Sequence, residues 1–174
     1  MLIQFKILSL NMVILTISAT LQKGIYLVPF DYNGPISSYY MEWGGTKPHA
    51  TIAGFENQRS NINQIVQLTA KKSMADDRWT FSCEKNKCYV ERSGSLKLMK
   101  FSARTVTNIS YYLKQLGIKN LHSPNPCHIT LCKTSETSFS TSRAITALEA
   151  ARDWRLVVVD KNGSVVTWKN NYDV

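Results

Sequence analysis

The chain has 174 residues, of which 44% are hydrophobic and 19% are charged. This length and composition suit one domain that buries a core of its own, and they exclude a disordered chain. Lys and Arg together number 21 against 12 for Asp and Glu, so the formal charge is +9. That excess favours an anionic partner, which is a nucleic acid, a nucleotide or a membrane surface.

The first twenty residues fit two interpretations. An apolar run from Ile7 to Ala19 follows a single Lys, which is typical of a short secretory signal. The alternative is an extra N-terminal strand, and the run is too short and too interrupted by polar residues to predict a membrane span. We therefore expect a secreted protein if residues 1–20 are a signal and a cytoplasmic one otherwise, with residues 21–174 forming a single domain.

The rest of the chain mixes predicted strands and helices. Runs rich in β-branched and aromatic residues predict strands, and apolar residues at helical spacing predict helices. The expected strands are 23–30, 49–55, 78–83 paired with 88–93, 95–101, 127–133 and a closing hairpin around the Asn162-Gly163 turn. This mixture, with hairpins between helices, predicts an α+β fold with antiparallel sheet.

Three helices are expected between these strands. The first begins near Ser60 and places Ile62, Ile65, Val66 and Thr69 on one face. The second is capped by Ser102, repeats Val106, Ile109, Leu113 and Leu116 at helical spacing, and ends at Gly117. The third covers about 141–152.

The four cysteines predict no metal site. Cys83 and Cys88 flank a predicted hairpin loop, so a disulfide between them is sterically allowed. Cys127 and Cys132 lie on opposite faces of one strand, about 16 Å apart, and cannot bond each other. The chain has no Cys or His spacing of the zinc-site kind, so we expect neither a metal nor a cofactor.

Two of the three histidines occur in the same short pattern. The segments are His49-Ala50-Thr51-Ile52 and His128-Ile129-Thr130-Leu131, 79 residues apart, and a predicted helix follows each. In a strand, residues i and i+2 share a face, so each His lies beside its Thr while the aliphatic residues point into a core. The repetition indicates an internal duplication whose two strands together offer two imidazoles and two hydroxyls to one ligand.

These groups suit the hydrolysis of a phosphodiester without a metal. One neutral imidazole can take a proton from the attacking water, while the other, protonated, gives a proton to the leaving oxygen. The Thr hydroxyls can donate hydrogen bonds to the non-bridging phosphate oxygens. Histidine titrates near neutral pH, so a pair can hold opposite protonation states. The motifs alone do not assign base and acid.

The motif pair resembles the signature of the two-histidine (2H) phosphoesterases, of the RNA 2′,3′-cyclic phosphodiesterase and 2′–5′ ligase-like kind. The resemblance implies two pseudo-twofold-related lobes, each an antiparallel sheet backed by helices, with a central cleft. It implies a monomeric hydrolase that acts on a cyclic phosphate or a 2′–5′-type linkage in a nucleotide, oligonucleotide or RNA end. His49 and His128 would be the catalytic pair, and Thr51 and Thr130 would bind phosphate. Cys127 departs from the aromatic residue that is usual before the second His.

Two further residues, Tyr26 and His122, lie outside the motifs, and two alternative functions fit the sequence. Tyr26, on the first predicted strand, is a candidate for stacking a base. His122 lacks the Thr and is expected to be a solvated loop residue. Two alternatives stay open: a non-catalytic basic nucleotide- or RNA-binding protein on the same fold, and a small secreted interaction protein stapled by a Cys83–Cys88 disulfide.

Overall fold

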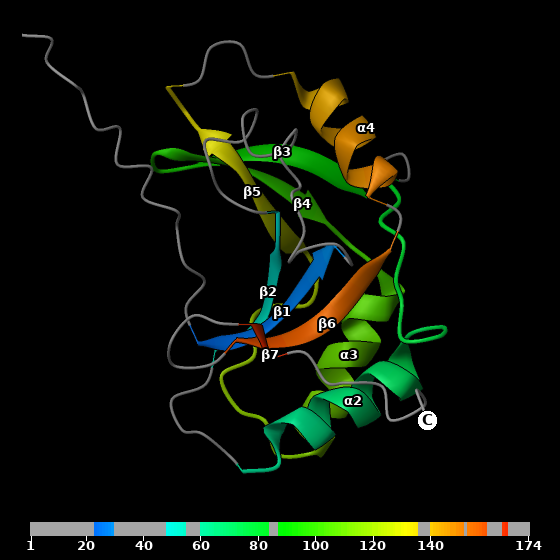
Figure 1. The fold of residues 1–174 in the computed structure, drawn as a ribbon. Coiled ribbons are helices and arrows are strands. Elements are labelled where there is room, and N and C mark those ends of the chain that lie inside the picture. The colour runs from blue at the N-terminus through cyan, green and yellow to red at the C-terminus, as the bar shows by residue number, and fades with distance from the viewer. Residues whose placement is uncertain are drawn as a thin grey trace, which may run out of the picture.

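The structure is a computed structural model that describes residues 23–29, 48–54, 60–83, 87–135, 140–151, 153–159 and 165–166. In these segments the backbone forms one sheet of seven strands together with three helices (Figure 1). The expectations for residues 1–20 lie outside the described residues. Within the described segments, no helix has the length and apolar character needed to cross a membrane.

Every strand of the sheet runs antiparallel to its neighbours. The strands are β1 (Gly24–Pro29), β2 (Ala50–Gly54), β3 (Cys88–Ser93), β4 (Leu96–Phe101), β5 (Cys127–Lys133), β6 (Trp154–Val159) and β7 (Val165–Val166). Their order across the sheet is β3-β4-β5-β2-β1-β6-β7. The two motif strands, β2 and β5, are therefore neighbours near the middle of the sheet (Figure 1). The predicted α+β class with antiparallel sheet is confirmed.

The helices bury their apolar faces in one core. They are α2 (Ile62–Ser73), α3 (Arg104–Gln115) and α4 (Thr141–Ala150), and α2 packs beside α3 (Figure 1). The predicted face of α2 is buried, and side chains of all three helices join a single cluster with one face of the sheet. That sheet face is represented by Leu27, Met99 and Ile129. We call it the helix face.

The opposite face of the sheet carries the alternate side chains of each strand, because strand side chains alternate between faces. Where β1 meets β6, this face holds a small separate cluster of Tyr26, Val28, Val157 and Val159. Of the three described helices, none contributes a side chain to this cluster. We call this second face the open face.

The predicted pairing of 78–83 with 88–93 is wrong. Strand β3 pairs with β4 instead, and the backbone of Trp79 exchanges hydrogen bonds of 2.9 and 2.7 Å with Trp154. Trp79 and Phe81 pack against Phe101 and Trp154, with ring centroids 5.4–6.3 Å apart. Burial of these large rings against distant partners outweighs the local hairpin that the composition suggests.

This change also separates the two cysteines for which the sequence allows a disulfide. Cys83 lies outside any strand, its backbone N–H donates to the Glu149 carboxylate at 2.9 Å, and Cys88 lies opposite Phe101. All four cysteines are free thiols.

The remaining boundaries follow the prediction with small shifts. The strand pairing of the closing hairpin is confirmed, since β6 pairs with β7, while its Asn162-Gly163 turn lies outside the described residues. Ser102 does not cap α3, because Ala103 is the N-cap residue and the Ser102 hydroxyl contacts the Asn125 side chain instead. Leu116 follows the end of α3 and is 36% exposed, so it does not join the buried face as predicted.

Candidate active site

The two His-x-Thr motifs meet where β2 joins β5. Ala50 lies directly opposite Ile129, and both side chains are fully buried on the helix face. Because side chains alternate, His128 and Thr130 of β5 and Thr51 of β2 belong to the open face, as does His49. The structure thus brings all four predicted residues to one side of the sheet.

Ala50–Ile129 is the one pair that joins these two described strands; if its register continued by one residue in each direction, Thr51 would lie opposite His128 and His49 opposite Thr130. His49 and His128 would then be diagonal neighbours, whose Cα atoms lie about 7–8 Å apart in a regular antiparallel ladder. Each hydroxyl would then face the histidine of the other motif.

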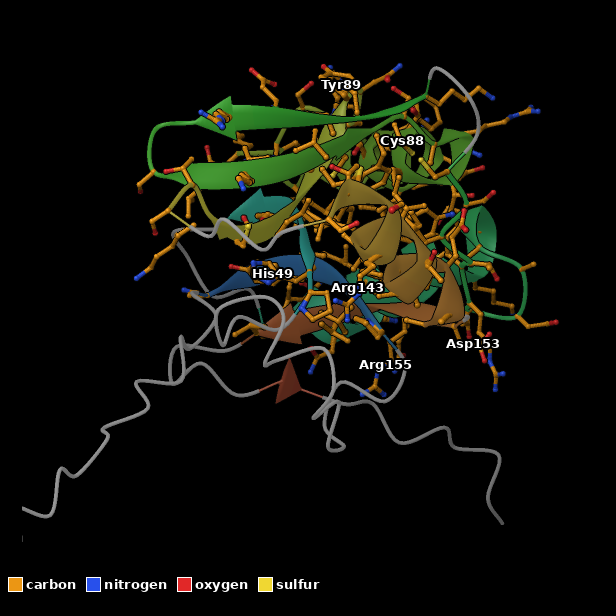
Figure 2. The ribbon with its side chains drawn as sticks, turned by 90° about the horizontal axis from the view of Figure 1, so that it is seen from above. His49, Cys88, Tyr89, Arg143, Asp153 and Arg155 are labelled. Carbon is orange, nitrogen blue, oxygen red and sulfur yellow. The ribbon has the colours of Figure 1, made fainter. Side chains whose placement is uncertain are left out.

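His49 is held by an aromatic contact. It lies directly before β2, and its ring meets the ring of Tyr26 edge-on with the centroids 5.6 Å apart. Tyr26 is the cross-strand partner of Thr51, so the contact links β1 to the first motif. Figure 2 shows His49 in the central part of the molecule, between Tyr89 of β3 and Arg155 of β6.

The side chain of Tyr26 has little exposed surface on which a nucleobase could stack. It is 5% exposed and lies in the small cluster of the open face, and burial raises the pKa of its hydroxyl. Its placement supports a role in orienting His49 and gives no support to stacking on a base. Sequence reasoning placed Tyr26 on the first strand, but its exposure depends on neighbours that are distant in the chain.

His128 lies in a partly buried and positively charged environment. Burial lowers the pKa of its imidazole, and the positive charges of Lys100, His122 and His49 lower it further. Lys100 of β4 is the cross-strand partner of His128, so its side chain belongs to the open face as well. The neutral form of His128 is therefore favoured at neutral pH, as a general base requires.

His122 is a third histidine near the site. It is exposed, as predicted for a loop residue, but its backbone N–H donates to the Ile52 carbonyl of β2 at 2.9 Å. The preceding Leu121 forms an isolated bridge with Ala53. This segment therefore lies along the first motif strand and brings His122 close enough to influence His128. Its sequence carries no motif, so only long-range pairing shows the proximity.

Cys127 precedes the second motif histidine, at the position where the two-histidine phosphoesterases usually have an aromatic residue. Its side chain is 2% exposed in the helix-face core, and its Sγ approaches the Thr51 carbonyl oxygen at 4.0 Å. Burial raises the pKa of this thiol to about 11. Because the thiolate is the reactive form, Cys127 is a structural residue between β5 and β2 and not a nucleophile at neutral pH.

Among the described residues, no three or more His, Cys, Asp or Glu side chains are grouped so as to hold a metal ion. Comparisons of the chain with protein-family models, curated proteins and solved structures found no match. What the site can do is therefore inferred from its own geometry.

Proposed function

We propose that this protein is a phosphodiesterase of the two-histidine kind. Its substrate would be a cyclic phosphate or a 2′–5′-type phosphodiester in a nucleotide, oligonucleotide or RNA end. The observation that carries the proposal is the Ala50–Ile129 pairing, because it puts both His-x-Thr motifs on one face of the sheet. The formal charge of +9 favours attraction of such an anionic substrate.

The proposed reaction is a displacement at phosphorus. His128, whose neutral form is favoured, accepts a proton from the attacking water as a new P–O bond forms. The bond from phosphorus to the leaving oxygen breaks, and His49 in its imidazolium form donates a proton to that oxygen. Thr51 and Thr130 donate hydrogen bonds to the non-bridging oxygens, where negative charge develops. Proton exchange with solvent restores both histidines.

The strand order supports the two-lobe arrangement that belongs to this proposal. Exchange of β1 with β4, of β2 with β5 and of β3 with β6 turns the order β3-β4-β5-β2-β1-β6 into the same order read backwards. Each motif strand is also followed by a helix, α2 after β2 and α4 after β5. We propose a pseudo-twofold axis between β2 and β5, with the substrate bound over that junction on the open face.

Turnover tests the proposal directly. The protein is incubated in excess chelator with a 2′,3′-cyclic mononucleotide and, separately, with a 2′–5′ oligoadenylate. We expect product from at least one of them, with His49→Ala and His128→Ala each lowering kcat by about 10²–10⁴-fold. His122→Ala is the matched histidine control and should keep product formation. Absence of product from both substrates, with all variants folded by circular dichroism, would contradict the proposal.

A non-catalytic phosphate-binding protein is the second candidate. The specific observation in its favour is Lys100 opposite His128, because a cation beside an imidazole can bind phosphate with no proton transfer. Saturable binding of either nucleotide, lost in Lys100→Gln and accompanied by no product, would favour this candidate.

A further inference from the structure

An exposed aromatic residue extends the site across the sheet. Tyr89 of β3 lies opposite Lys100 of β4, and Lys100 lies opposite His128 of β5. Cross-strand partners share a face, so the three side chains form one row on the open face. Neighbouring strands are about 4.8 Å apart, which places Tyr89 about 10 Å from His128 along this row.

The burial of β3 agrees with this assignment of faces. Cys88 and Val90 pack against the helix-face core, whereas Tyr89, between them, is 52% exposed. Figure 2 labels Tyr89 beside β3, the strand at one edge of the sheet. An aromatic ring, a cation and a catalytic imidazole thus follow one another in a line.

This line has the chemistry of a single-strand nucleic-acid site. Proteins that bind single strands combine cations along the backbone with aromatic side chains on which bases stack. We propose that Tyr89 and Lys100 bind the nucleotide next to the scissile phosphate, so that the preferred substrate is a single-stranded oligonucleotide and not a mononucleotide. Tyr89 stacks on the base, and the Lys100 ammonium contacts the adjoining phosphate. This inference rests on the proposed function.

Glu91 opposes the phosphate contact in part. Its carboxylate lies 3.8 Å from the Lys100 ammonium, and its side chain is half exposed. The Lys100 side chain is 23% exposed, and a pair of this length with a half-exposed carboxylate contributes little, so a phosphate can compete for the ammonium. Glu91→Gln removes both the competing partner and a repulsive charge, and we expect it to tighten oligonucleotide binding.

The first experiment compares two substrates that share a terminal base: a 2′,3′-cyclic mononucleotide and a trinucleotide ending in the same cyclic phosphate. We expect the wild type to prefer the trinucleotide in kcat/KM. Tyr89→Ala should lower that preference by about fivefold to 150-fold, the range for loss of one stacked base, while Tyr89→Phe retains it. The matched control is Tyr111→Ala, because Tyr111 is 57% exposed on α3, away from the row, and the preference should not change.

The second experiment measures binding without turnover. A 5′-labelled trinucleotide is titrated by fluorescence anisotropy into the His49→Ala/His128→Ala variant at several salt concentrations. Lys100→Gln in that background should reduce the slope of log affinity against log salt by about 0.7, the value for one phosphate contact on a single strand. Arg92→Gln makes the same change in net charge on the other face of β3 and should leave the slope unchanged.

The outcomes separate the two proposals. One outcome is that the wild type turns over both substrates equally well, or that Tyr89→Ala and Tyr111→Ala have the same preference for the trinucleotide. Either result overturns the proposed role of the row of Tyr89, Lys100 and His128 and leaves the phosphodiesterase proposal standing. If neither substrate is turned over but Lys100→Gln lowers the salt slope of binding and Arg92→Gln does not, the row is supported and the catalytic proposal fails. If there is neither turnover nor an effect of Lys100→Gln on the salt slope of binding, both are overturned.

Discussion

Ala50 lies directly opposite Ile129 at the join between β2 and β5, and neither side chain is exposed to solvent. This contact sets the relative positions of His49 and His128 on the other face. A larger side chain at residue 50 should push the two strands apart, with a stability cost of about 1–3 kcal/mol. We expect Ala50→Leu to reduce kcat and the free energy of unfolding together. Ile129→Val only removes a methyl group, so it should cost about 0.5–1.5 kcal/mol and keep activity.

The pH dependence of kcat/KM should report the environment of His128. Lys100 is one of the charges that lower its pKa, so Lys100→Gln should let that pKa rise. As the pH is lowered, a base with a higher pKa is already protonated, and so inactive, at a higher pH. The acidic limb of the profile should therefore move to higher pH. Arg92→Gln, on the other face, should leave the limb in place. An acidic limb that stays fixed in Lys100→Gln would contradict the assignment of His128 as the base.

The two threonines should contribute through their hydroxyl groups. Thr51→Val and Thr130→Val keep the shape of the side chain and remove one donor to the developing phosphate charge. Loss of one such donor lowers kcat by about 10²–10³-fold. Thr51→Ser and Thr130→Ser retain the hydroxyl, so we expect most of the activity to remain. Equal losses in the Ser and Val variants would show that the hydroxyl is not the active feature.

Tyr26 should act on catalysis through the ring of His49. The edge-on contact at 5.6 Å is lost in Tyr26→Leu and kept in Tyr26→Phe. An aromatic pair of this kind contributes about 0.5–1.5 kcal/mol, so we expect kcat to fall about two- to tenfold in the Leu variant with little change in KM. A rise in KM without a change in kcat would instead indicate direct contact with substrate.

The start of β1 has no room for a side chain. A Cβ atom added at Gly24 would lie 2.7 Å from the Ala53 carbonyl oxygen, whereas one added at its cross-strand partner Gly54 meets nothing within 4 Å. Gly24→Ala should therefore destabilise the protein by about 1–3 kcal/mol, measured by denaturant unfolding. Gly54→Ala is the matched control and should be close to neutral. Equal effects of the two changes would contradict the close approach of β1 to β2.

Local sequence patterns located most elements of this fold. The face of α2 that includes Ile65 and Thr69 was predictable, because helical periodicity is a property of neighbouring residues. The same holds for β5 and for the closing hairpin. The predicted hairpin at 78–83 is wrong because a long-range contact determines the position of this segment. The backbone of Trp79 is hydrogen-bonded to that of Trp154, which lies 75 residues further along the chain.

The candidate site divides in the same way. The sequence alone determined that each His shares a face with its Thr, because alternation along a strand needs no knowledge of the rest of the molecule. Only the tertiary structure decided that β2 and β5 are neighbours, that His122 and Lys100 lie close to His128, and that Tyr26 is buried against His49. These relationships depend on pairings between distant segments, and the free energy of such pairings comes from burial of the whole core, which no short stretch of sequence encodes.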